Sequence, residues 1–483
     1  MSLLQGTDVQ QRIERRLGRR SFLTGTACGL GGIALSQMLT RDVFGDTGRR
    51  TGHTAHFTPR AKNVIFIFMS GAPSQYDLFL PRPELQRLHG QPVPESYLRN
   101  LDDALIKGSA QVFATPRKFH QHGECGMYFS DYLPQMAQCA DDWCMVRTMT
   151  TDIANHHPAQ LLMNCGVPLF GHPSMGSWIT YGLGSDADDF PGFVVLLSNS
   201  GEGVDGGSSL WANGFLPSEF GGVNFRSKGD PILNLANPQN VTLRTQRHRL
   251  DAIRRLNSIQ AKDTGDPEIM SRIESYELAY RMQIAAPELV DLSTESQRTH
   301  QMYGIDQDRT RWFGSNCLLA RRMVERGVRF VQLYHSTWDD HSNLNTKLKT
   351  NCDMTDQPVA ALLRDLKQRG LLDETLVVWG GEFGRTPMNE VRRGNTPGKE
   401  GRDHHPFCFT MLLSGGGIQT GQIHGETDDL GYHPVKDPMH VHDLQATILH
   451  CLGLDHEQLT FRHQGRDFRL TDIGGNVVQS LLR

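Results

Sequence analysis

The sequence predicts an α/β fold in which a mostly parallel central sheet is flanked by helices and carries a helical insertion. Three observations predict it. Continuous apolar runs end in polar loops, a helical apolar pattern lies between two of these runs, and a long charged stretch is helix-like. Strand and helix patterns that alternate in this way are typical of α/β proteins.

The first predicted strand covers residues 63–69, with the sequence NVIFIFM. A strand that is apolar at almost every position is buried on both faces, as strands of a parallel sheet are. Two more runs, which are mainly apolar, cover residues 328–334 and 375–379, and each ends in a polar loop. We therefore expect three buried strands of one parallel sheet.

A helix is expected between the second and third of these strands. Residues 355–369 place apolar side chains at helical spacing and stop at Gly370. Strand, helix and strand together form a βαβ crossover. An apolar strand over residues 407–413 and a helix over residues 441–452 continue the pattern.

The region 224–312 differs from the rest because it is long, charged and helix-like. We assign it to a helical insertion within a single domain that covers residues 60–480. Its clearest helical pieces are residues 247–261 and 267–286. The insertion is either a solvated cap or a cover for the site or for a partner surface, and the sequence leaves both readings open.

The amino terminus carries Arg15, Arg16, Arg19 and Arg20 before an apolar, glycine-rich run. This segment resembles a twin-arginine export signal, and we assign residues 1–45 to the signal and a linker. The run is too short and too rich in small polar residues for a good membrane span. We expect passage through the twin-arginine machinery to a periplasmic or extracellular location. Release and retention by an uncleaved signal both stay open.

The composition is that of an ordinary globular protein, with 483 residues and a formal net charge of -4. It lacks the basic excess that nucleic-acid binding requires, so nucleic acid is not an expected partner. The 21 histidines are a high count, and histidine is the commonest metal ligand. Nine cysteines include no C-x-x-C pair, and the sequence does not indicate an oligomeric state.

Metal-ligand residue types follow the predicted strands. In open parallel sheets the functional groups lie just beyond the carboxyl ends of the strands. The side chains at such places, or just before the strand at 407–413, are Asp77, Asp339, His341, Glu382, His404 and His405. Each is a weak signal alone, and their shared position is the stronger one.

Five segments carry a family resemblance: VIFIFMSGAPSQYDLF, NHHPAQLLMNCG, WDDHSN, LLDETLVVWGGEFGRTP and GRDHHP. On these segments the chain resembles, over residues 61–455, the alkaline phosphatase superfamily, specifically the exported, sulfatase-like branch called domain of unknown function 1501. The resemblance implies one or two divalent metals near an anion. It implies one metal on Asp339, His341 and either His404 or His405, and a second on Glu382 with Asp77.

The residue types set the expected metal and substrate. Imidazole nitrogens together with carboxylates favour Zn²⁺ or Mn²⁺ over Ca²⁺. Two such ions could clamp the attacking and leaving oxygens of a phosphate or sulfate ester. The resemblance therefore implies an anionic ester, on a polysaccharide or a lipid, as substrate. Arg385 is a candidate for neutralising the anion, and a surface salt bridge is its alternative role.

The nucleophile expected from the resemblance is missing. Relatives place Ser, Thr or a modified Cys at the start of a helix, and His156 stands at that position here, before Pro158 and Gly166. His156 is then either a metal ligand beside a metal-bound hydroxide or a histidine nucleophile. Otherwise the site is not hydrolytic.

The leading hypothesis is therefore an exported metal-dependent hydrolase of sulfate or phosphate esters. The alternative is a non-catalytic binding or scaffold protein on the same fold, which the absent hydroxyl or thiol nucleophile favours. The ligand-type residues after the strands favour the hydrolase.

Overall fold

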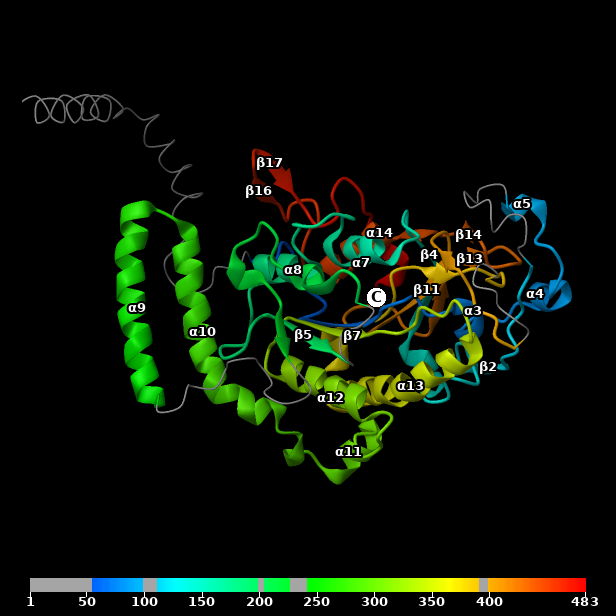
Figure 1. Ribbon diagram of the computed structural model, residues 1–483, viewed down its shortest axis with the longest axis horizontal. Coiled ribbons are helices and arrows are strands. Elements are labelled where there is room, and N and C mark those ends of the chain that lie inside the picture. Colours follow the sequence, from blue (N-terminus) through cyan, green and yellow to red (C-terminus); the bar gives the residue numbers. More distant parts are fainter. Residues whose placement is uncertain (1–53, 99–110, 199–203, 226–240, 391–397) are drawn as a thin grey trace, which may run out of the picture. The chain divides into compact units, whose positions relative to one another are not determined.

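A nine-stranded sheet organises the protein, seen here in a computed structural model (Figure 1). The structure describes residues 54–98, 111–198, 204–225, 241–390 and 398–483. The predicted signal at residues 1–45 lies outside these ranges. All described residues belong to one compact unit, Gly52–Arg483.

The sheet has the strand order β12-β4-β11-β8-β1-β7-β5-β6, with β15 paired to β4. All its pairings are parallel except those of β11, which runs antiparallel to both β8 and β4. The prediction of a mostly parallel sheet is confirmed. Its strands are β1 (Asn63–Met69), β4 (Cys144–Thr150), β5 (Phe193–Leu197), β6 (Val223–Phe225), β7 (Phe330–His335), β8 (Thr375–Gly380), β11 (Phe409–Ser414), β12 (Gln422–His424) and β15 (Met439–His440).

Helices cover both faces of this sheet, with α7, α8 and α14 on one face and α12 and α13 on the other (Figure 1). The alternation of side chains along β1 explains why both faces need covering. Val64, Phe66 and Phe68 belong to the core on the α7 side, whereas Ile65 and Ile67 belong to the core on the α13 side. The run is apolar throughout because its alternate side chains point to opposite faces, and each face packs against its own layer of helices.

The helices are α3 (Gln75–Leu78), α4 (Pro83–Leu88), α5 (Glu95–Leu98), α7 (His156–Cys165), α8 (Met175–Leu183), α9 (Leu243–Thr264), α10 (Pro267–Val290), α11 (Gln297–Tyr303), α12 (Arg311–Glu325), α13 (Leu344–Gln368) and α14 (Val441–Cys451). The crossover helix predicted at 355–369 is the second half of α13, which runs through Pro358. The sequence pattern did not predict the first half of α13 because the first turns of this helix are mainly polar.

Four two-stranded sheets lie outside the main sheet. They pair β2 (Phe119–His122) with β3 (Met127–Ser130), β9 (Gly384–Arg385) with β10 (His404–His405), β13 (Glu426–Thr427) with β14 (Pro434–Lys436), and β16 (Phe461–His463) with β17 (Arg466–Phe468).

The helical insertion is present, and α9 and α10 form an antiparallel pair within it. Thr242 caps α9 by accepting a hydrogen bond from the backbone of Thr245. Between the helices, Arg247 lies 2.6 Å from both Asp251 and Glu277. The predicted pieces at 247–261 and 267–286 lie inside α9 and α10.

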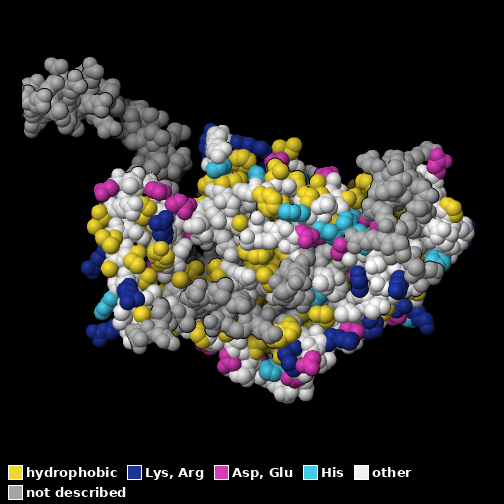
Figure 2. All heavy atoms as spheres, in the orientation of Figure 1, with side chains coloured by type: hydrophobic (Ala, Val, Ile, Leu, Met, Phe, Trp, Pro, Cys, Tyr) yellow, Lys and Arg dark blue, Asp and Glu magenta, His cyan; other side chains and the backbone are white. Residues whose placement is uncertain are grey.

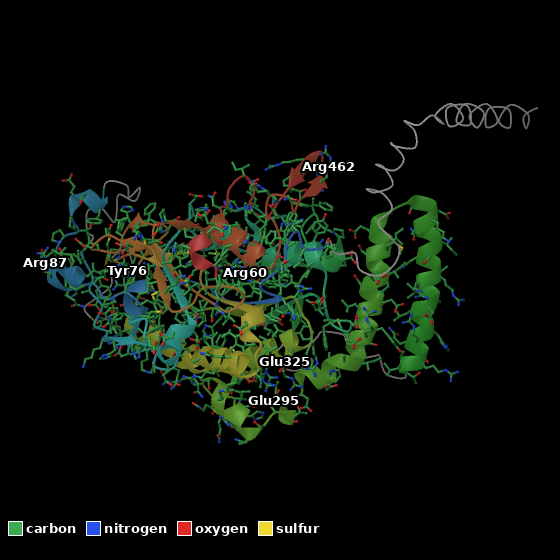
Figure 3. All side chains as sticks on the ribbon, turned by 180° about the vertical axis from the view of Figure 1, so that it is seen from behind. Arg60, Tyr76, Arg87, Glu295, Glu325 and Arg462 are labelled. Carbon is green, nitrogen blue, oxygen red and sulfur yellow. The ribbon has the colours of Figure 1, made fainter. Side chains whose placement is uncertain are left out.

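A buried arginine fastens α12 to its neighbours on the α13 side of the sheet. Arg321 lies 2.7 Å from Glu295 and 3.0 Å from Asp365, and it also pairs with Glu325. Glu295 and Glu325 are labelled in the reverse view (Figure 3). Because the Arg321 side chain is only 3% exposed, removing one carboxylate would leave a buried charge poorly compensated.

The eight cysteines in the described ranges are all free. Among the helices in those ranges, none combines the length and the apolar character that crossing a bilayer requires.

His335, the last residue of β7, is a fully buried neutral histidine. Trp338 Nε1 donates a hydrogen bond of 3.0 Å to His335 Nδ1, so the proton of the neutral ring is on Nε2. Nε2 has no hydrogen-bond partner among the described residues. A second proton on Nδ1 would face the indole N–H, so the site disfavours the charged ring.

We predict that His335 makes the fold acid-sensitive. Burial lowers its pKa from 6.5 to about 4, so between these values the unfolded chain binds more protons than the folded one. This contribution is complete above pH 6.5 and is lost as the pH falls toward 4, by about 3 kcal/mol. In urea unfolding at pH 7 and pH 5, His335→Gln should lose less stability on acidification than the wild type. His120→Gln, at an exposed site, is the matched control, and equal losses in both variants would contradict the prediction.

Candidate metal centre

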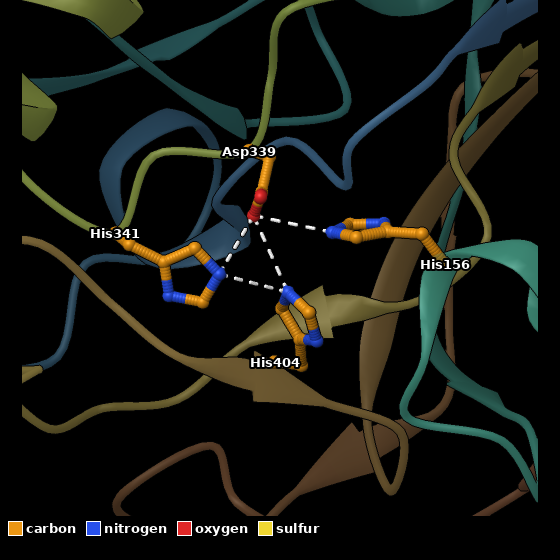
Figure 4. Close-up of side chains that lie close together, drawn as sticks. All are labelled: His156, Asp339, His341 and His404. Atoms are coloured by element: carbon orange, nitrogen blue, oxygen red, sulfur yellow. Dashed lines mark hydrogen bonds and ion pairs between the residues drawn. The ribbon is translucent and has the colours of Figure 1, made fainter. Parts of the chain in front are cut away.

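Three imidazoles and one carboxylate converge at the carboxyl edge of the sheet (Figure 4). Asp339 Oδ1 lies 3.1 Å from His156 Nε2, 3.0 Å from His341 Nε2 and 3.3 Å from His404 Nε2. His341 Nε2 and His404 Nε2 are 3.0 Å apart. All four ligand-type atoms lie within 4.8 Å of one another. Figure 2 shows histidine and acidic side chains side by side on the surface near α7.

The loop after β7 supplies Asp339 and His341. It turns sharply, with Thr337 at a φ of 80°, and packs against the loop after β1. Gly71, in that second loop, has a φ of 108°, and a Cβ on it would lie 2.6 Å from the Asp339 backbone nitrogen. Only glycine permits this approach, so the two strand-end loops share one close contact.

The short strand β10, paired with β9, supplies His404. In this short antiparallel ladder, His404 lies opposite Arg385 and His405 opposite Gly384. The chain then enters β11, the antiparallel strand, so a residue just before β11 lies at the same sheet edge as residues just after β7 and β8. His156 comes from a third direction, as the first residue of α7, with Asn155 at the N-cap.

Each histidine has its Nδ1 bound to an acceptor, which fixes the tautomer. His156 Nδ1 lies 2.6 Å from Glu382 Oε1, His404 Nδ1 lies 2.7 Å from the Ala154 carbonyl, and His341 Nδ1 lies 3.2 Å from Glu390 Oε2. Since carboxylates and carbonyls only accept, each Nδ1 donates. In the neutral rings every Nε2 then carries a lone pair that points into the cluster.

These lone pairs fit a metal cation. His341 Nε2 and His404 Nε2 face each other, and all three Nε2 atoms face a carboxylate oxygen. His156 Nε2 is buried and faces Asp339 Oδ1. Lone pairs in contact repel unless a positive charge lies between them. Three imidazole nitrogens and one carboxylate oxygen are a ligand set that Zn²⁺ accepts.

The electrostatics also favour positive charge here. Burial opposes the charge on Asp339, but hydrogen bonds with His156, His341 and His404 and the Arg385 charge hold its pKa far below 3.8. Burial lowers the pKa of His156, but the Asp339 and Glu382 carboxylates outweigh it and raise the pKa to about 9. Burial dominates at His404 and lowers its pKa to about 4. Without a cation, the cluster therefore holds protons.

Glu382 and Arg385 lie next to the cluster and hold its members in place. Glu382 is fully buried and accepts from the Gly71 backbone at 3.0 Å and from Gln160 Nε2 at 3.1 Å, besides facing His156. Arg385 is also fully buried, and its Nη2 donates to Asp339 Oδ1 at 2.6 Å. Its other N–H groups donate to the Ala72 and Arg402 carbonyls.

Two other residues expected at the site lie elsewhere. Asp77 is fully buried and its Oδ2 lies 2.7 Å from Arg402 Nε, in an ion pair with both side chains 0% exposed. His405 Nε2 donates to the Tyr432 carbonyl at 2.7 Å, and burial lowers the pKa of His405 to about 3. Neither belongs to the group of four, nor does Glu382.

Sequence reasoning missed the supporting residues Gln160 and Glu390. Gln160 bridges Ser70 Oγ, at 2.8 Å, and Glu382. Glu390 forms a second possible ligand group with Asp403 and His341, all three buried. The only signal for Gln160 was its place in the segment NHHPAQLLMNCG, which carries the family resemblance. Glu390 follows no predicted strand, so no pattern marked it.

Comparison with protein families gives a match to the model described as "Protein of unknown function (DUF1501)", over residues 61–482. This match confirms the family named from the sequence motifs. The comparison with curated proteins finds no match.

Solved structures of low similarity also match. One is a protein in the alkaline phosphatase superfamily from Vibrio parahaemolyticus, with 10% identity, 85% of this chain and 71% of that chain covered, and a TM-score of 0.34. Another is the lipoteichoic acid synthase LtaP from Listeria monocytogenes, with 9% identity, 84% and 76% covered, and a TM-score of 0.33. A third is the alkaline phosphatase of the Antarctic bacterium TAB5, with 8% identity, 74% and 92% covered, and a TM-score of 0.30.

The neighbouring histidines give a direct test of the ligand set. We predict that His404→Ala loses one metal equivalent per protein, because its Nε2 faces the cluster. His405→Ala should retain the metal, because its ring faces Tyr432, although its stability should fall by about 1–3 kcal/mol through the lost hydrogen bond. Elemental analysis of both folded variants decides the matter, and equal metal content in the two would contradict the assignment.

Proposed function

The chain belongs to the DUF1501 family, and on that premise we propose that it is an exported, metal-dependent hydrolase of sulfate or phosphate esters. The convergence of three histidine Nε2 atoms on Asp339 Oδ1 carries the proposal. A bound Zn²⁺ or Mn²⁺ ion would polarise an ester oxygen and lower the pKa of water, the chemistry such hydrolysis needs. The ion's charge would also favour an anionic substrate.

We assign one metal ion to four ligands, which are His156, Asp339, His341 and His404. Glu382 and Arg385 are positioning residues in this proposal. Glu382 fixes the ring of His156 through Nδ1, and Arg385 orients the carboxylate of Asp339. The N–H groups of Arg385 already donate to protein oxygens, so we give it no role in direct substrate binding.

The cluster is accessible from one side, which supports a reactive rather than a purely structural role. The Asp339 side chain is 40% exposed and that of His404 is 18% exposed, whereas Glu382 behind them is fully buried. An ester could therefore approach from the Asp339 side. A substrate carried on a polysaccharide or a lipid fits an open site of this kind.

Water, rather than a side chain, is the nucleophile we propose. Both ring nitrogens of His156 are committed, Nδ1 to Glu382 and Nε2 to the cluster, so neither is left to attack the ester. Cys165 lies at the far end of α7, and burial raises the pKa of its thiol to about 12. Its thiolate would not form at neutral pH.

We propose export through the twin-arginine machinery, and the paired arginines before the apolar run support this route. A periplasmic or extracellular location follows, with the signal either cleaved or kept. That route carries folded proteins, so the metal could be inserted before export.

A non-catalytic binding or scaffold role is the second candidate, and one observation favours it. The four protein ligands would fill a tetrahedral zinc site, as they do in structural sites, whereas catalytic zinc keeps an open position.

Metal removal distinguishes the two candidates. We predict that the purified protein hydrolyses aryl phosphate or aryl sulfate, that chelation abolishes turnover, and that added Zn²⁺ or Mn²⁺ restores it. Glu382→Gln should lower the metal affinity about 10–100-fold, as loss of a carboxylate that orients a ligand histidine does. A metal-loaded protein without turnover on either ester would support the scaffold role. A protein that binds no metal would contradict both the hydrolase and the structural zinc site.

A further inference from the structure

A pocket at the β12 edge of the sheet is separate from the metal centre. Its volume is about 90 Å³, and its walls come from the segment between α3 and α4, from β3, from β4 and from β12. The apolar part of the wall consists of Phe79, Leu80, Tyr128, Met145 and Ile423. β4 lies three strand positions from β1, or roughly 14 Å at about 4.8 Å per strand.

Two arginines, Arg82 and Arg147, line this pocket together. Arg82 donates through Nη2 to Thr427 Oγ1, and Arg147 donates through Nη2 to the Gly425 carbonyl at 3.0 Å. The Nε atom of each is buried and has no hydrogen-bond partner in the described ranges. Both guanidinium groups therefore retain unused donors inside a partly apolar wall.

Neither arginine forms an ion pair with a carboxylate of the described residues. Nearby acids have other partners: Glu426 lies 3.0 Å from Lys436, and Asp428 accepts from the backbone of Tyr432 at 2.7 Å. Burial, and then the charge of Arg82, lower the pKa of Arg147, and the smaller opposing effect of the Glu426 charge does not cancel them. Half-buried like charges side by side cost free energy unless an anion compensates them.

We propose that the Arg82 and Arg147 pocket binds a small oxyanion, a free sulfate or phosphate ion. Guanidinium groups match the oxygens of such ions through paired N–H donors. The volume suits a free oxyanion better than an ester with a large substituent. The pocket shares no residue with the metal cluster, so oxyanion binding here is independent of the proposed hydrolysis.

The test is a titration of the full purified protein with sodium sulfate and with sodium phosphate, followed by calorimetry at an ionic strength held constant with sodium chloride. Saturable binding is expected for the wild type. Arg82→Met and Arg147→Met should each raise the Kd about tenfold or more, because a charge-assisted hydrogen bond is lost. Phenylphosphonate, which keeps the anion but adds a ring, should bind more weakly than phosphate. Tighter phenylphosphonate binding at the same arginines would contradict the free-ion assignment.

Two controls keep the result specific. Arg462→Met removes an exposed arginine, seen on β16 in Figure 3, and should leave the Kd unchanged. His341→Ala disrupts the metal cluster, so it should abolish any anion binding at the metal centre but leave the Kd of the Arg82 and Arg147 pocket unchanged. If Arg147→Met does not fold, Arg147→Lys keeps the charge, loses the fork, and should still weaken binding.

Binding lost in His341→Ala and kept in both arginine variants would place the oxyanion at the metal centre and overturn the proposal. Absence of saturable binding to either ion would also overturn it.

Discussion

The contact of three imidazole Nε2 atoms with one carboxylate oxygen is the constraint on which the rest of the site depends. Asp339 Oδ1 touches His156, His341 and His404 at 3.0–3.3 Å, an arrangement that is repulsive for neutral rings without a cation. Buried neighbours enforce it. Arg385 holds Asp339, Glu382 holds His156, and the missing side chain of Gly71 lets the loops approach. We infer that the four clustered side chains and their buried neighbours together form a cation site.

Much of this could be predicted because strand ends mark the site. The parallel strands β7 and β8 deliver Asp339, His341 and Glu382 to one edge, as the apolar runs indicated. His404 precedes its strand, which would normally put it at the opposite edge. It reaches the site because β11 runs antiparallel, and no local pattern announces that direction. The family resemblance grouped either His404 or His405 with Asp339, and the structure places His404 beside it.

The rest depended on side-chain direction and on distant partners. Adjacent residues in an extended segment point to opposite faces, so His404 and His405 cannot both face Asp339, and only their pairing with β9 decides which does. The sequence could not show that Asp77 pairs with Arg402, because the two residues lie far apart along the chain. Arg402 neutralises the Asp77 carboxylate inside the core. Glu382 is a carboxylate at a strand end, yet a backbone N–H and Gln160 turn it toward His156. The Arg82 and Arg147 pocket is also formed by segments far apart in sequence.

X-ray absorption spectroscopy at the metal edge of the purified protein tests the central claim most directly, since it reports the atoms that surround the ion. The account predicts three imidazole nitrogens at about 2.0–2.1 Å and one carboxylate oxygen at a similar distance if the ion is zinc. The multiple-scattering signal of three rings should disappear stepwise as His156, His341 and His404 are replaced. A sulfur shell, or a metal with oxygen neighbours alone, would contradict the account.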